Sequence, residues 1–132
     1  MPKDNVMNFK TKMIMDVFKN LEAYKLSCKI TIITNMDYIK SNKKTNKLNI
    51  LNHCTMSCLE CIETIDLCQY FIASKSISMV KAIIFTTNIL KHCIECCSKT
   101  GFDPVLKEVN VDTTIRQCKI LIRSLNKLKK LV

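Results

Sequence analysis

Cysteine is the residue type in this sequence whose chemistry stands out most. Nine cysteines occur among 132 residues. Thiolates bind soft ions such as Cu(I) and Zn(II), or iron–sulfur clusters, in preference to hard cations. We therefore take every cysteine as a candidate metal ligand: Cys28, Cys54, Cys58, Cys61, Cys68, Cys93, Cys96, Cys97 and Cys118.

Two pairs of cysteines are spaced so that they could share one ion. Cys54 and Cys58 are four residues apart, and so are Cys93 and Cys97. On an α-helix such residues lie one turn apart on the same face, with Cβ atoms about 5–6 Å apart. Seven of the nine cysteines fall between residues 54 and 97. We therefore expect any ion site to lie between the two helices that contain these pairs.

Two other interpretations of the cysteines stay open. Free cysteine is among the most buried residue types and packs as a small hydrophobe, so core thiols need no metal. Alternatively, the CxxC pairs that begin at Cys58 and Cys93 could meet across two helices as four tetrahedral zinc ligands. The run from Cys54 to Cys61 also matches the cluster motif of radical enzymes that use S-adenosylmethionine, but this chain is too short for their barrel.

The two histidines each precede a cysteine, at His53 and His92. Neighbouring residues on a helix point about 100° apart, so both imidazoles should lie beside the cysteine face. They could guard access to a metal site or simply lie at the solvent boundary, and we favour the boundary. The same geometry disfavours a Cys–His nucleophile pair, and no phosphate loop, serine nucleophile or paired carboxylates are visible. We expect the protein not to be an enzyme.

The scarcity of turn residues predicts an all-α fold. The chain is 48% hydrophobic but contains one Gly and two Pro. An all-β fold needs turn residues at short intervals, and a disordered chain could not contain so many apolar residues. We predict one domain over residues 1–132, an antiparallel four-helix bundle with helices over residues 7–40, 48–73, 78–99 and 112–131.

Apolar residues recur at three- and four-residue steps in the predicted helices, as expected of buried helix faces. Gly101 directly follows the third helix, where a left-handed C-cap residue is typical. Asp103 and Pro104 suit the N-cap and first turn of a short helical segment. The stripe of the first helix consists of Ile14, Val17, Phe18, Leu21, Tyr24, Cys28, Ile32, Met36 and Ile39.

The charge and hydropathy of the chain bear on its partners and its location. The net charge is +10, and the basic residues are mostly Lys, with Arg only at Arg116 and Arg123. Specific nucleic-acid recognition favours Arg over Lys. We interpret the charge as solvated surface and do not expect a nucleic-acid partner. No apolar run reaches the roughly 18–20 residues of a membrane span, and residues 1–12 lack a signal-peptide core. We expect a cytoplasmic protein with reduced thiols.

Residues 51–125 resemble the cysteine-rich four-helix-bundle copper-storage proteins. The similarity rests on three runs, HCTMSCLECIETIDLC, LKHCIECCSKTG and DTTIRQCKILIRSL. It implies a bundle that holds Cu(I) ions inside, on CxxxC motifs that face the core. The implied paired ligands are Cys54, Cys58, Cys93 and Cys97, and the implied additional core thiols are Cys61, Cys68 and Cys96.

The chain departs from the pattern of that family in its outer helices. Cys28 is alone on the first helix, and Ile122 and Leu125 follow Cys118 where the family would continue a cysteine series. This departure implies a cysteine-depleted member with low capacity, or a relative that keeps only the fold.

Two functions are therefore predicted. The first is a cytoplasmic protein that binds or stores Cu(I), with Zn as the other candidate ion, on core-facing thiolates. The second is a non-enzymatic helical interaction protein, for example a viral or symbiont factor that binds a host protein, whose cysteines are inert core residues. The second predicts an exposed apolar groove and a protein partner, and the sequence gives no oligomeric state.

Overall fold

The computed structural model describes residues 2–132, with side chains described from Phe9 onward. Over these residues the chain forms four α-helices and no strand, which confirms the all-α class. The helices are α1 (Pro2–Ser41), α2 (Leu48–Ala73), α3 (Met79–Gly101) and α4 (Asp112–Leu131), with a 3-10 turn at Pro104–Leu106.

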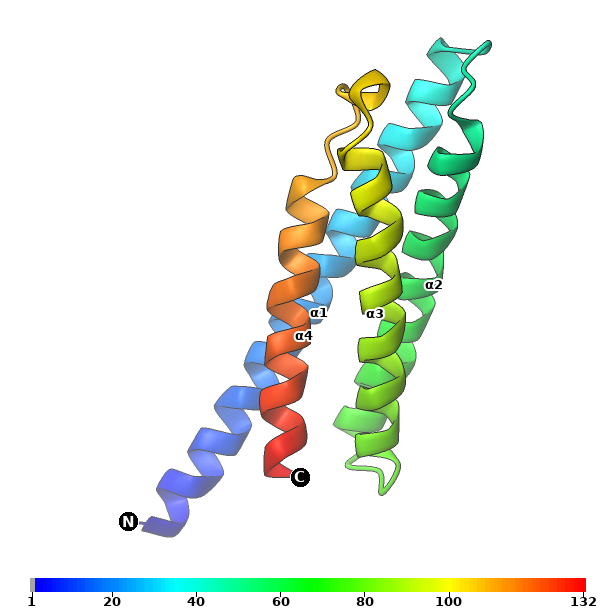
Figure 1. The fold of residues 1–132 in the computed structure, drawn as a ribbon. Helices are drawn as coiled ribbons and strands as arrows, with labels where there is room; N and C mark the ends of the chain where they lie inside the picture. The colour runs from blue at the N-terminus through cyan, green and yellow to red at the C-terminus, as the bar shows by residue number, and fades with distance from the viewer. Residues whose placement is uncertain (1) are drawn as a thin grey trace.

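The four helices form a closed bundle. Each helix contacts its neighbours in chain order, and α1 closes the ring by packing against α4. Figure 1 shows that successive connections lie at opposite ends, so that neighbouring helices run antiparallel. The connections α1–α2 and α3–α4 share one end of the bundle, and the α2–α3 connection lies at the other (Figure 1). Among residues 2–132, no helix is both long and apolar enough to cross a membrane.

The buried face of α1 differs from prediction at its C-terminal end. Met36 is 60% exposed, so its predicted place in the core is wrong, and the buried residues there are Thr31 and Asn35. Both fit the helical spacing from the preceding core residues, and each makes a polar contact. The Thr31 and Thr114 hydroxyls are 2.7 Å apart, and Asn35 Nδ2 donates to Thr55 Oγ1 over 3.0 Å. Hydrogen bonding lets these polar side chains replace an apolar residue in the core.

The rest of the predicted α1 stripe lies in the core or at its margin. Val17, Leu21, Tyr24 and Cys28 are fully buried. The remaining members pack, partly buried, against this core: Ile14, Phe18, Ile32 and Ile39.

The prediction that Gly101 is a left-handed C-cap is wrong. Gly101 is the last residue of α3, and the positive φ in the described chain belongs to Lys75, at 52°, in the α2–α3 connection. The C-cap is Phe102, whose backbone N–H donates to the carbonyl of Ser98. The glycine instead lies close to α4's N-cap residue, since an added Cβ would be 3.1 Å from Cγ2 of Val111 and would require that side chain to shift by a few tenths of an ångström.

The α3–α4 connection is tied to the start of α2. The Asp103 carboxylate accepts from the backbone N–H of Val105 over 2.9 Å, which confirms the predicted N-cap of a short helical turn. The same carboxylate pairs with Lys47 Nζ at 3.0 Å, just before α2. These contacts hold together the end of the bundle that contains the first turns of α2 and the last turns of α3.

Candidate metal centre

One face of α2 directs four thiols into the bundle. These are Cys54, Cys58, Cys61 and Cys68, and each is at most 1% exposed. Their steps of four, three and seven residues keep them on one helical stripe, as predicted. From α3, Cys93 and Cys97 face them and are equally buried.

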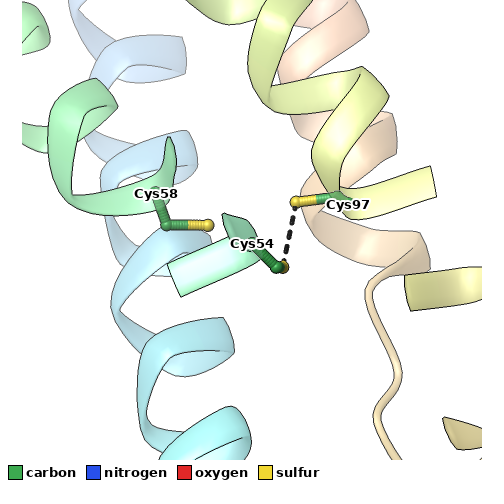
Figure 2. Close-up of side chains that lie close together, drawn as sticks. All are labelled: Cys54, Cys58 and Cys97. Atoms are coloured by element: carbon green, nitrogen blue, oxygen red, sulfur yellow. Dashed lines mark hydrogen bonds between the residues drawn. The ribbon is translucent and has the colours of Figure 1, made fainter. Parts of the chain in front are cut away.

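Three of these sulfurs form a compact group between α2 and α3. The Sγ atoms of Cys54, Cys58 and Cys97 all lie within 4.8 Å of one another and could hold a metal ion. The closest two, Cys54 and Cys97, are 3.5 Å apart and are joined by the dashed line in Figure 2. Metal–sulfur bonds of about 2.3 Å require sulfurs about 3.8–4.0 Å apart. Small side-chain movements would therefore fit the three thiols to one ion.

Cys93 extends this group along α3. Its Sγ lies 3.8 Å from that of Cys97 and 4.0 Å from that of Cys58. The four thiols of the two CxxxC pairs thus follow one another as Cys54, Cys97, Cys93 and Cys58. This cluster lies between the second and third helices, where the sequence predicted that any ion site would be.

α1 adds a thiol and a hydroxyl next to the cluster. Tyr24 and Cys28 are fully buried, and the Tyr24 hydroxyl donates to Sγ of Cys61 over 3.4 Å. Hydrogen bonding to Cys28 raises the pKa of Cys58 and the pKa of Cys61. The same thiol is the main cause of a lowered pKa at Cys93. Cys28 therefore affects the pKa of thiols on both α2 and α3.

Hydrogen bonding among the thiols favours a thiolate at Cys54. Bonds with Cys58 and Cys97 lower the pKa of Cys54 to about 3, although burial acts in the opposite direction. The pKa of Cys97 shifts in the opposite direction, because hydrogen bonding to Cys54 raises it. Metals bind the thiolate form, so Cys54 can bind an ion without first losing a proton.

Two polar side chains near Cys54 were not predicted as part of the site. Asn35 and Thr100 are fully buried, and Asn35 Oδ1 and Thr100 Oγ1 have no hydrogen-bond partner in the described part of the chain. Both residues lie close enough to Cys54 to lower its pKa. The sequence indication is their spacing, because Asn35 is seven residues from Cys28 and Thr100 three from Cys97. We missed them because only apolar residues and cysteines were assigned to the buried faces.

The remaining cysteines have other partners. Cys118 of α4 donates to the carbonyl of Leu90 over 3.3 Å, and burial raises its pKa to about 12. Cys68 lies further along α2, where burial raises its pKa and Thr86 acts against that shift. Cys96 lies beside a histidine at the surface of α3. Their assignment as metal ligands stays a prediction.

The alternative zinc site is not assembled as the spacing suggested. It needed Cys96 and Cys61 to converge with Cys58 and Cys93. Instead, Sγ of Cys96 lies 3.5 Å from Nε2 of His92, and Sγ of Cys61 faces the Tyr24 hydroxyl. The mutually close sulfurs found in the described chain join the CxxxC pairs rather than the CxxC pairs.

The fold and the site together define a helical bundle with a buried thiol cluster that could hold a metal ion. Comparison of the chain with protein-family models, with curated proteins and with solved structures found no match.

Proposed function

We propose that this protein binds Cu(I) inside the bundle on the thiolates of Cys54, Cys58 and Cys97, and that it is not an enzyme. The observation that carries the proposal is the mutual approach of these three sulfurs, all within 4.8 Å, from two different helices. Three thiolates in a dry site are ligands that a soft, singly charged ion accepts.

The ligand number favours Cu(I) over Zn(II). A structural zinc site uses four converging ligands in a tetrahedron. Cys93 is close to Cys58 and Cys97 but does not belong to the group of mutually close sulfurs. Cu(I) needs no fourth ligand, so the existing triad suffices. The resemblance of residues 51–125 to copper-storage proteins supports the same choice.

The arrangement also supports a low capacity. Cys68 and Cys118 lie beside Thr86 and the Leu90 carbonyl, so these thiols add little to an ion held by the triad. Cys93 lies 4.0 Å from Cys58 and 3.8 Å from Cys97, near enough to take part in binding one further ion. We expect one or two Cu(I) ions per chain rather than a long series.

A titration tests this proposal. Reduced protein is titrated with Cu(I) against a competing copper chelator, and the same protein is titrated with Zn(II) against a zinc indicator. We expect at least one tightly held copper per chain and weaker binding of zinc. Less than one copper per chain would refute the proposal, and tight zinc binding with no copper preference would reassign the ion.

A second candidate function is favoured by the surface of α1. Leu26, Ile30 and Ile33 are each more than half exposed and lie at helical spacing on one face. Such a stripe suits a helical interaction protein that binds another protein and whose thiols are inert. The copper titration separates the two candidates, because inert core thiols hold no copper.

A further inference from the structure

Cys96 and His92 form a pair at the outer surface of α3. Cys96 is 8% exposed, whereas the other eight cysteines are at most 1% exposed. His92, one turn earlier, is exposed to solvent. Sγ of Cys96 and Nε2 of His92 are 3.5 Å apart. The pair thus combines the most accessible thiol of the protein with a second metal-binding atom.

The separation of these two atoms suits a shared ion. Metal–sulfur and metal–nitrogen bonds of about 2.3 Å and 2.0 Å at a tetrahedral angle place the two ligand atoms about 3.5 Å apart. Thiolate and imidazole are both ligands of soft or borderline ions.

A small polar residue connects this pair with the core cluster. Ser57 of α2 is buried, and its Oγ lies 3.6 Å from Sγ of Cys93. Hydrogen bonding to Ser57 also acts to lower the pKa of Cys96, against the stronger effect of burial. Ser57 thus lies beside the core thiol of Cys93, and Cys93 is three residues from Cys96, so the two cysteines are neighbours one turn apart on α3.

An ion must reach the core thiols by way of a more accessible ligand. An ion in solution cannot meet Cys54, Cys58 or Cys97 directly, because none is more than 1% exposed. Soft ions move between proteins and small molecules by exchanging one thiolate ligand for another. Among the cysteines, Cys96 is the one best placed to make the first exchange.

We propose that Cys96 and His92 form an outer site that accepts Cu(I) from a complex with a small thiol and passes it by way of Cys93 to the core cluster. This inference rests on the proposed function. In the first exchange, the bond from copper to the donor sulfur breaks and a bond to Cys96 forms. The Cys96 proton leaves with the donor, which departs as a thiol. In the second, the bond from copper to Cys96 breaks as a bond to the Cys93 thiolate forms, and the released Cys96 thiolate takes up a proton from solvent. Copper stays Cu(I) throughout.

The chain provides a matched control for the histidine. His53 and His92 each follow a leucine by two residues, directly precede a cysteine, and are exposed. One turn after His53, however, the residue is Ser57 rather than a cysteine. Cys68 provides the control for the thiol, because it is buried in the same bundle away from Cys96. H53N and C68S should therefore behave like the unaltered protein.

The experiment follows the rate of copper transfer from a Cu(I)–dithiothreitol complex to reduced protein by stopped-flow absorbance, with capacity measured separately at equilibrium. We expect C96S to slow transfer about tenfold or more and H92N to slow it less, since groups around a metal commonly contribute factors of 10–100. Capacity should be unchanged in both. C96A, which keeps no polar atom at this position, should slow transfer as much as C96S.

Two results would overturn this inference while leaving the proposed function intact. One is transfer to C96S at the unaltered rate. The other is a lower copper capacity in C96S, which would make Cys96 a ligand of the stored ion. Failure of the unaltered protein to bind copper at all would instead refute the proposed function. Circular dichroism of each variant verifies that it is folded.

Discussion

The two ends of the α2–α3 contact differ although the same stripe of cysteines follows α2 through both. At one end, Cys54 and Cys58 face the thiols of Cys97 and Cys93. At the other, Cys68 is just as buried, but its neighbour on α3 is Thr86. The cysteines at the two ends are equally buried and lie on the same stripe of α2. They differ only in the residue of α3 that faces them. A thiol becomes part of a possible metal site when the partner helix presents another thiol at the same level.

The antiparallel register of the two helices accounts for this difference. Residue numbers rise along α2 as they fall along the facing part of α3. Cys54 therefore meets Cys97, and Cys58 meets Cys93. One turn further, Cys61 meets the carbonyl of Ile89. The series of thiol pairs ends there because α3 has no cysteine before Cys93.

We expect the end of the α2–α3 contact that contains Ile65 and Cys68 to contribute to the stability of the fold. We expect the end that contains Cys54 and Cys58 to bind the metal ion. Ile65 is fully buried between Cys61 and Cys68. We expect Ile65→Ala to lower the free energy of unfolding by roughly 2–5 kcal/mol, because it removes buried methyl groups and leaves a cavity. Denaturant unfolding measures this loss, and the copper capacity of the folded variant should be unchanged. A lost capacity would show that the two ends are not independent.

Replacing one cysteine with serine at each end compares the contributions of the two ends to copper binding directly. Removing a group that only orients a ligand weakens metal binding about 10–100-fold, so Cys54→Ser should weaken Cu(I) binding at least that much. Cys68→Ser, a change of the same kind at an equally buried position, should leave the affinity unaltered. Competition titration measures both variants. Equal losses would mean that the whole stripe, rather than the facing pairs, binds copper.

The stability of the metal-free protein should depend on pH through Cys54 but not through Cys68 near neutral pH. This effect is expected to be smaller than the effect on copper affinity. The pKa of Cys54 is lowered to about 3 from its ordinary value of 9.0, so the folded state holds a thiolate where the unfolded state holds a thiol. Its contribution to stability is present above pH 9.0 and is lost as the pH falls toward 3. Cys68, whose pKa is raised, stays protonated in the folded state near neutral pH.

The thiolate absorbance of metal-free protein at pH 6 measures this contrast. We expect the absorbance to fall in Cys54→Ser, where the thiolate of Cys93, whose pKa is also lowered, still contributes, and to be unchanged in Cys68→Ser. Absence of thiolate absorbance in the unaltered protein at that pH would show that the cluster holds only thiols, and copper binding would then release one more proton per ion.

Several features of the site were predictable from local spacing, and others were not. The stripe from Cys54 to Cys68 follows from the period of a helix, and so does the burial of Cys93 and Cys97. The polar residues Asn35 and Thr100 were missed, because their burial depends on hydrogen bonds and thiols supplied by other helices. Met36 was assigned to the core by its type, although at the end of α1 the buried face has turned toward Asn35.

The sequence by itself determined the helices and the faces that the thiols occupy, because both depend on residues a few positions apart. Only the tertiary structure decided which thiols meet. The contact between Cys54 and Cys97 joins residues 43 positions apart, and it depends on the register at which α2 and α3 pack. The contact between Ser57 of α2 and Cys93 of α3 depends on the same packing, whereas Cys96 and His92 are paired by their four-residue spacing within α3. Register is set by how whole helix faces fit together, which no local spacing reveals.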